Sequence, residues 1–224
     1  MTPLLMSSAE IVEDLPLAIN ALRDIGVEFH GRGWSLGTSS NYSILLSASP
    51  FRLLITASGK DKSKLGPGDF VVVDEVGNPV NGYGLSGKPS AETLLHVVAA
   101  KQPGVGSILH THSVWSTTLS DLHHREGGLT IEGYEMLKGL EGVKTHEHRQ
   151  WVKIFENTQD IDALAKEVEE RFGSEEEPFS HGFLLRRHGL YTWGKDLVEA
   201  RRHIEIFEFL FETLVRTRLL KGTL

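Results

Sequence analysis

Long helical patterns at both ends of the chain enclose a middle region of short apolar runs, and this arrangement limits the possible folds most. Within residues 7–29, apolar side chains recur every three or four positions. After Asp196 an apolar stripe again steps by three and four residues. The segments between them are short and are separated by glycine and proline turns. We therefore expect a sheet layered between helices.

The middle of the chain contains the candidate strands. Alternating or continuous apolar runs predict strands within residues 41–46, 51–61, 69–80, 106–113 and 182–194. The last of these segments is expected to form two strands that turn at Gly189. A helix is predicted within residues 88–103, which carry a proline near each end. Because no repeat or long linker divides the chain, residues 1–224 are predicted to form one domain.

The composition excludes several classes of protein. A formal charge of −7 argues against nucleic acid or an anionic membrane as the main partner. The chain has no cysteine, so disulfides, thiolate catalysis and cysteine-held metals are excluded. It also has no apolar run of about 18 residues, and residues 1–15 lack the pattern of a signal peptide. We therefore expect a cytoplasmic protein.

Two histidines, His110 and His112, stand one residue apart at the end of an apolar run. On a strand, residues i and i+2 point to the same face, so both imidazoles would approach one point. A metal ion requires this of its first two ligands. The alternative is that one imidazole is an ordinary hydrogen-bonded interior group.

Other histidines differ in their surroundings. His188 also follows an apolar run and precedes a glycine, so it is a candidate third ligand that would leave a fourth position open for substrate. His146 and His148 repeat the spacing of the first pair, but they lie among charged residues and are predicted to form a solvated loop. His96 lies in an apolar helix and is expected to pack in the core.

Three segments together carry a family resemblance: SILHTHS at residues 107–113, GYEMLKGL at 133–140 and LLRRHGLYTWG at 184–194. They resemble the class II aldolase/adducin family, over nearly the whole chain. HEHRQWVKIFENTQDI, residues 146–161, and the 133–140 segment are most similar to the members that dehydrate a phosphorylated ketose. The histidine pair itself marks the whole family.

The resemblance implies a fold, a cofactor and an assembly. The implied fold is a three-layer α/β/α sandwich with a mixed, largely antiparallel sheet. His110, His112 and His188 match the family's zinc ligands, with one ion per subunit. The family forms homotetramers with active sites near subunit interfaces, and its substrates are sugar phosphates.

A phosphorylated substrate requires an anion site, which an acidic chain must build from local amides and hydroxyls. Runs of small residues can turn successive backbone amides toward an anion, although each run taken alone is more simply an ordinary turn. The family holds phosphate with loops at these places, and Ser40 stands where the commoner motif has glycine. The residues expected to bind substrate here are Gly37, Thr38, Ser39, Asn41, Ser58, Gly59 and Lys60.

Two carboxylates, Glu92 and Glu135, are candidates for proton transfer. As plain helix residues, Glu92 would be a first-turn acid that favours the helix dipole and Glu135 would be exposed. The residues alone do not separate them. By resemblance, Glu135 matches the acid/base of the dehydratases and is favoured for proton transfer. Glu92 matches the catalytic glutamate of the aldolases and is expected to be a second substrate-facing group.

Three functions therefore remain open. Dehydration of a phosphorylated ketose is favoured. A sugar-phosphate aldolase or 4-epimerase is the second possibility, because the same metal centre serves both reactions. A non-catalytic interaction domain like the adducin head is the third, and the presence of all three histidines argues against it.

Overall fold

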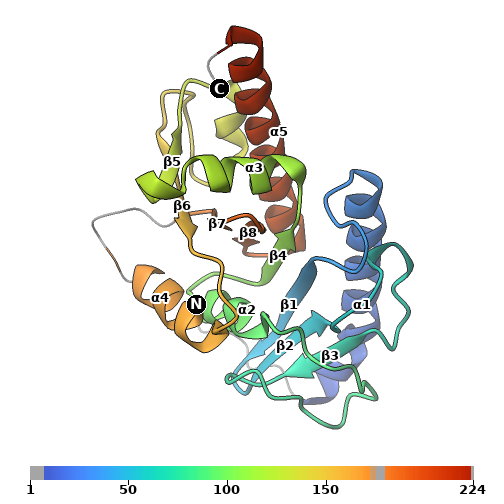
Figure 1. The fold of residues 1–224 in the computed structure, drawn as a ribbon. Coiled ribbons are helices and arrows are strands. Elements are labelled where there is room, and N and C mark those ends of the chain that lie inside the picture. The colour runs from blue at the N-terminus through green and yellow to red at the C-terminus, as the bar shows by residue number, and fades with distance from the viewer. Residues whose placement is uncertain (1–7, 173, 175–179, 223–224) are drawn as a thin grey trace.

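The computed structural model describes residues 8–172, 174 and 180–222, and in this part of the chain eight strands form one sheet (Figure 1). The strand order is β3-β2-β1-β4-β8-β7-β6-β5. The strands are β1 Asn41–Ala48, β2 Phe51–Thr56, β3 Phe70–Val73, β4 Ser107–Thr111, β5 Gly128–Ile131, β6 Gln150–Phe155, β7 Gly182–Leu185 and β8 Gly189–Gly194.

The sheet is mixed and largely antiparallel. Every neighbouring pair is antiparallel except β6 and β7, which run parallel. A parallel pair requires a crossover connection, and α4, Ile161–Phe172, lies in the connection between these two strands. β4 and β8 lie in the middle of the sheet, and they bring the predicted histidine segments side by side.

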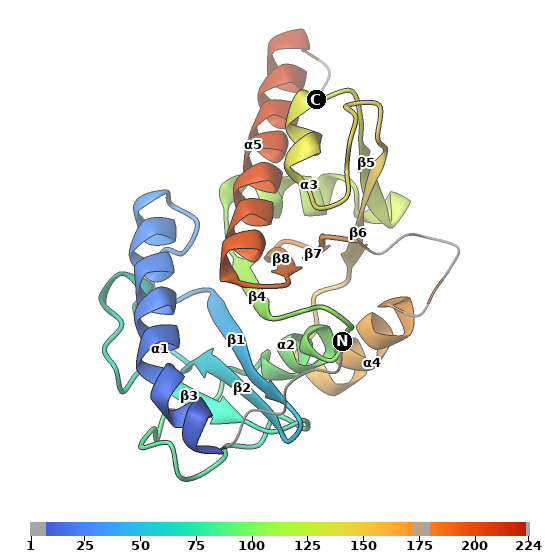
Figure 2. The same ribbon diagram turned by 180° about the vertical axis from the view of Figure 1, so that it is seen from behind.

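Helices cover both faces of the sheet (Figures 1 and 2). Buried side chains of α1 Ser8–Gly31, α3 Val114–Leu122 and α5 Leu197–Lys221 belong to one core cluster. Those of α2 Thr93–Ala100 and of α4 belong to the other. The expected α/β/α sandwich is therefore confirmed. The short 3-10 helices are η1 Lys62–Lys64, η2 His124–Glu126 and η3 Glu135–Gly139.

The two terminal helices follow the predicted pattern. In α1, Leu15, Leu22 and Ile25 are buried. Asp196 caps α5, because its side chain accepts a hydrogen bond from the backbone N–H of Glu199 at 2.8 Å. Gly222 ends α5 with φ +64°, a conformation that favours glycine.

Some elements differ from the prediction. The helix expected within residues 88–103 is shorter, and α2 begins only at Thr93. Glu92 therefore stands at the helix cap and its side chain makes no capping bond, so it is not a first-turn acid. The last strand segment does split in two, with β8 beginning at Gly189. The helices α3 and α4 and the strands β5 and β6 were not identified from the sequence.

Candidate metal and substrate site

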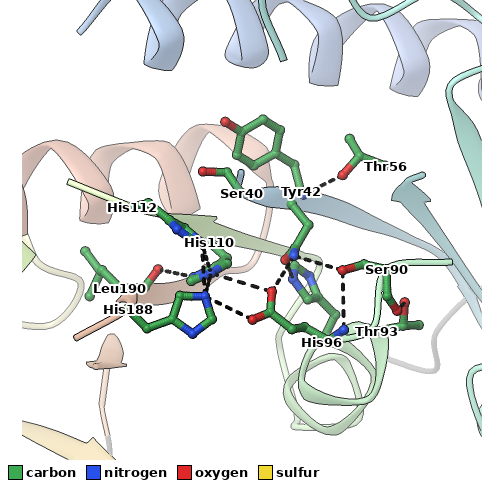
Figure 3. A network of polar contacts seen from close by, with 12 residues as sticks. Ser40, Tyr42, Thr56, Ser90, Thr93, His96, His110, His112, His188 and Leu190 are labelled. Atoms are coloured by element: carbon green, nitrogen blue, oxygen red, sulfur yellow. Dashed lines mark hydrogen bonds and ion pairs between the residues drawn. The ribbon is translucent and has the colours of Figure 1, made fainter. Parts of the chain in front are cut away.

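Three imidazoles converge at the centre of the sheet (Figure 3). The Nε2 atoms of His110 and His112 are 2.8 Å apart. The Nε2 atom of His188 lies 3.4 Å from that of His110 and 3.1 Å from that of His112. The sequence prediction that these three residues form one cluster agrees with this geometry.

The two central strands place the histidines. His110 lies in β4, and His112 directly follows the last residue of that strand, where its backbone N–H donates to the Trp34 carbonyl at 2.8 Å. His188 lies in the turn between β7 and β8. Gly189 allows this turn to approach β4, because a Cβ there would lie 2.0 Å from the Thr111 carbonyl oxygen.

The environment of His110 and His112 favours their neutral form. His110 Nδ1 donates to the Leu190 carbonyl at 2.9 Å, so its Nε2 presents a lone pair to the other two rings. Burial, and then the neighbouring histidines, hold the pKa of His110 well below its ordinary value. Burial is also the main reason why the pKa of His112 falls to about 3.

The three nitrogens fit a divalent cation. Neutral imidazoles are the form that binds metal, and each Nε2 here lies within reach of one common point. A tetrahedral ion with nitrogens at about 2.0–2.1 Å keeps them roughly 3.3 Å apart. The separations of 2.8–3.4 Å are close to that value.

The side chain of Glu92 lies next to the three histidines. Its Oε1 lies 3.1 Å from His188 Nε2, and its Oε2 lies 3.6 Å from His110 Nε2. The same Oε2 accepts a hydrogen bond from Asn41 Nδ2 at 2.7 Å. Of the two candidate carboxylates, Glu92 is therefore the one that meets the histidines within this chain.

A cavity of about 480 Å³ opens beside the cluster. His112, His188 and Glu92 line it, whereas His110 is fully buried beneath it. Among the predicted substrate residues, those that line the cavity are Thr38, Ser39, Asn41, Ser58 and Gly59. Segments far apart in the sequence thus meet at one cavity whose rim is rich in hydroxyl groups.

Gly37 and Lys60 do not line this cavity. The Lys60 ammonium instead pairs with Asp69 Oδ1 at 2.8 Å. Gly37 adopts φ +65° in the turn before β1. Their part in substrate binding stays a prediction.

Ser40 occupies the place of the family's glycine with a glycine-like backbone. Its φ is +71°, in the left-handed region that non-glycine residues rarely adopt. Ser40 therefore holds a backbone conformation that glycine adopts without strain, at the cost of local strain.

Several cavity residues were missed by sequence reasoning. Thr117 of α3 and Arg187 beside His188 line the cavity, and so do Asn157, Thr158, Gln159 and Ile161. The last four belong to the 146–161 segment that carries the resemblance to dehydratases. That resemblance was the available signal, but nothing in it located the segment beside the histidines.

Glu135 lies elsewhere. It begins η3, its side chain is 72% exposed, and it does not line the histidine cavity. Lys138 Nζ donates to its Oε1 at 2.5 Å, and this bond is the main reason why the pKa of Glu135 is lowered. His146, 3.7 Å from Glu135 Oε2, is exposed, as predicted for a solvated loop.

The chain belongs to the class II aldolase and adducin family. The family's sequence model, described as the Class II Aldolase and Adducin N-terminal domain, matches residues 20–215.

Individual relatives narrow this class. A methylthioribulose-1-phosphate dehydratase of Marinobacter nauticus is 46% identical over 201 residues, which are 89% of this chain and 93% of that protein. One from Alcanivorax borkumensis is 42% identical over 207 residues, 92% of this chain and 94% of that protein. An L-fuculose-1-phosphate aldolase structure from Thermus thermophilus shares the fold, with a TM-score of 0.71 and 22% identity over 93% of this chain and all of that chain.

Among the described residues, none of the helices combines the length and the apolar character needed to cross a membrane.

Proposed function

We propose that this protein dehydrates 5-methylthioribulose 1-phosphate to 5-methylthio-2,3-dioxopentyl phosphate and water, a step of methionine salvage. The observation that carries the proposal is the 46% identity, over 89% of the chain, to a methylthioribulose-1-phosphate dehydratase. The cluster of His110, His112 and His188 beside a cavity lined with hydroxyl groups supports it.

The reaction removes a proton from C3 and the hydroxyl group from C4, and the enol that remains becomes the 2,3-diketone. Such a reaction needs an electrophile at the C2 carbonyl and a group that moves a proton. We propose one zinc ion per subunit on the three histidines; when bound there, it supplies the Lewis acid that polarises the carbonyl.

The substrate phosphate is assigned to the side of the cavity that is lined by the loops before β1 and after β2. Thr38 and Ser39 offer hydroxyls and backbone amides before β1, and Ser58 and Gly59 offer the same after β2. Gly59 has φ +71°, so its backbone turns sharply there. Successive amides in such turns bind anions without a charged side chain.

Proton transfer is assigned to Glu135, with Glu92 as a second group that faces the substrate. Because Glu135 does not line the cavity of its own chain, we propose that it reaches the cavity of a neighbouring subunit. Met136, beside it, is 38% exposed, and Phe209 of α5 is 48% exposed in the same groove. Packing of a neighbour here would bury these side chains and replace the pairing of Glu135 with Lys138.

One observation favours a second candidate, a sugar-phosphate aldolase. Glu92 stands 3.1 Å from His188 Nε2, at the place where the resemblance puts the aldolase glutamate. An aldolase would break the C3–C4 bond and leave dihydroxyacetone phosphate instead of a diketone.

The test is to incubate the purified, zinc-loaded protein with 5-methylthioribulose 1-phosphate and to identify the products. Formation of the diketone with no dihydroxyacetone phosphate is the expected result. Cleavage to dihydroxyacetone phosphate would replace the dehydratase with the aldolase. We propose that the chain forms a homotetramer, whose mass in sedimentation should be about four times 24.9 kDa. A monomer at micromolar concentration would contradict the assignment of Glu135 to a neighbour's cavity.

A further inference from the structure

Behind Glu92 lies a chain of buried polar side chains that the proposed reaction does not use. Asn41 bonds Glu92 through its amide nitrogen, and its Oδ1 contacts His96 Nε2. On its other side, His96 Nδ1 lies 2.8 Å from Ser43 Oγ. Asn41 is 4% exposed, and His96 and Ser43 are fully buried (in Figure 3, His96 lies to the right of the histidine cluster). His96 is therefore more than the packing residue expected from the sequence.

The donors and acceptors between Glu92, Asn41 and His96 can be assigned from the Glu92 carboxylate outward. A carboxylate accepts, so the Asn41 group that faces Glu92 is the amide NH₂. Its second hydrogen is directed to Ser90 Oγ, 3.1 Å away. The Asn41 carbonyl must then accept, so His96 carries its proton on Nε2 and accepts on Nδ1 from the Ser43 hydroxyl.

Burial keeps His96 neutral, because it lowers the pKa of this imidazole to about 3. A neutral ring leaves a lone pair on Nδ1 for the Ser43 hydroxyl. The geometry favours that direction, because Ser43 Oγ lies 2.8 Å from Nδ1 and 3.5 Å from its other acceptor, the Ile108 carbonyl. The side chain of Asn41 is likewise fully used by Glu92, Ser90 and His96. No amide hydrogen of Asn41 is left for a substrate phosphate.

These contacts fix the orientation of the Glu92 carboxylate. Its Oε2 is held from behind by Asn41, whereas its Oε1 faces His188 Nε2 at 3.1 Å. A carboxylate fixed at one oxygen keeps the other directed at one place, and active-site groups require such support. The backbone of Glu92 is also fixed, because its N–H donates to Ser90 Oγ at 3.3 Å.

We propose that His96 is a positioning residue, which acts through Asn41 to hold the Glu92 carboxylate with Oε2 bound and Oε1 directed to the histidine cluster. In this assignment Asn41 serves the carboxylate, and only its backbone remains available to the substrate. The functional part of the proposal rests on the proposed function, in which Glu92 faces the substrate. The structural part concerns this chain alone.

The first test compares His96→Gln with His96→Leu. A glutamine amide can occupy the place of the Nε2–H donor to Asn41, whereas leucine fills the space without a donor. Both variants are loaded with zinc, and kcat, KM and zinc content are measured with 5-methylthioribulose 1-phosphate. We expect the leucine variant to lose about 10- to 100-fold in kcat, with KM within about threefold and zinc retained, and the glutamine variant to recover most of the loss. Equal loss in both variants, or a normal rate with leucine, would overturn the proposal.

A second test does not depend on turnover. Nitrogen-15 NMR of the wild-type histidines should show His96 as the neutral tautomer with its proton on Nε2, and a proton on Nδ1 or on both nitrogens would overturn the proposal. Crystal structures of the two variants should show Glu92 Oε2 released from Asn41 with leucine and bound with glutamine. If the leucine variant does not fold, Ser43→Ala removes only the donor to Nδ1. His96 should then keep its proton on Nε2, because the Asn41 carbonyl still accepts it, and a proton on Nδ1 in this variant would overturn the proposal. These readouts stand even if the substrate proves to be a different sugar phosphate.

Discussion

The imidazole of His110 lies flat against the ring of Tyr191, with ring centroids 3.9 Å apart and planes inclined by 13°. The two residues are partners across β4 and β8, so the pairing of the central strands creates the contact. Both are fully buried. Together with the bond from His110 Nδ1 to Leu190, the stack leaves the His110 ring one orientation, with Nε2 toward the other two histidines.

Removing the Tyr191 ring from His110 should weaken metal binding, although the three metal-binding histidines stay unchanged. Tyr191→Phe keeps the stacked ring and should keep the zinc affinity. Tyr191→Leu removes the flat surface and should lower the affinity by about 10- to 100-fold, the usual effect of losing a group that orients a metal ligand. Competition with a chelator of known affinity measures the difference. Equal affinity in all three proteins would show that the stack does not orient His110.

The ligands themselves are tested by His110→Ala and His112→Ala. Each should lose bound metal and activity together, because two remaining imidazoles hold zinc weakly. Elemental analysis after gel filtration measures the metal. His148→Ala is the control, since it belongs to the second, predicted solvated pair and should keep its metal. Full occupancy in either ligand variant, or loss of metal in the control, would show that the ligand set is wrong.

The clustering of the three histidines could be predicted from the sequence for a physical reason. The two-residue period of a strand places His110 and His112 on one side, and a turn at Gly189 brings His188 to the end of the neighbouring strand. The strand order β1-β4-β8-β7 could not be predicted from the sequence. This order brings Glu92, at the start of α2, beside His188. Spacing along the chain carries no information about that contact, whose residues lie almost a hundred positions apart.

The part of the cavity wall that comes from residues 157–161 could not be predicted from the sequence for a similar reason. It lies between β6 and α4, two elements that were not identified. β6 alternates only partly between buried and half-buried residues, so its period is a weak signal. The inner polar chain was missed as well, because His96 in an apolar helix has the same pattern whether it packs or donates a hydrogen bond.

The two glutamates are separated by Glu135→Gln and Glu92→Gln. If Glu135 moves the proton, its variant should lose about 10²- to 10⁴-fold in turnover and keep its zinc. The Glu92 variant should lose less, because it would still face the substrate without being the essential base. Turnover and zinc content are measured for both on the same substrate. An inactive Glu92 variant beside a nearly normal Glu135 variant would contradict the assignment and favour the aldolase.

The same prediction extends to the location of Glu135. An inactive Glu135→Gln chain and an inactive His110→Ala chain are mixed, dissociated and reassembled. If Glu135 serves the cavity of a neighbouring subunit, some sites in the mixed assembly combine an intact His110 with an intact Glu135, and activity returns. If both residues act within one chain, no mixed site is whole and the mixture stays inactive.

Ser40 provides a test of backbone strain. Its φ of +71° favours glycine, so Ser40→Gly should relieve strain and raise the free energy of unfolding by about 0.5–1 kcal/mol. Part of the gain is offset by loss of the contact from Ser40 Oγ to the Trp34 carbonyl at 3.3 Å. Ser39→Gly is the matched control, because Ser39 is not among the residues with positive φ and should lose stability on substitution. Urea unfolding measures both. A less stable Ser40→Gly would show that the serine side chain matters more than the strain.

We expect Lys62 to make the stability of the protein depend on pH. Its side chain is buried beneath α1, where its Nζ donates to the Lys60 carbonyl at 2.8 Å. Burial lowers the pKa of Lys62 to about 8 from 10.5, and the charges of Asp61 and Asp69 offset part of this effect. Between these two values the unfolded chain binds more protons than the folded one, so stability rises with pH in that window.

Comparison with Lys62→Met isolates this contribution, because every other group titrates alike in both proteins. From about pH 7.5 to about pH 9.5, the free energy of unfolding of the wild type should gain about 1–2 kcal/mol relative to the variant. Below about pH 7 the difference should be constant, since Lys62 is then charged in both the folded and the unfolded state. Urea unfolding at a series of pH values measures both curves. Parallel curves across the whole window would mean that Lys62 keeps an ordinary pKa in the folded protein, and that water reaches its ammonium group in spite of the burial.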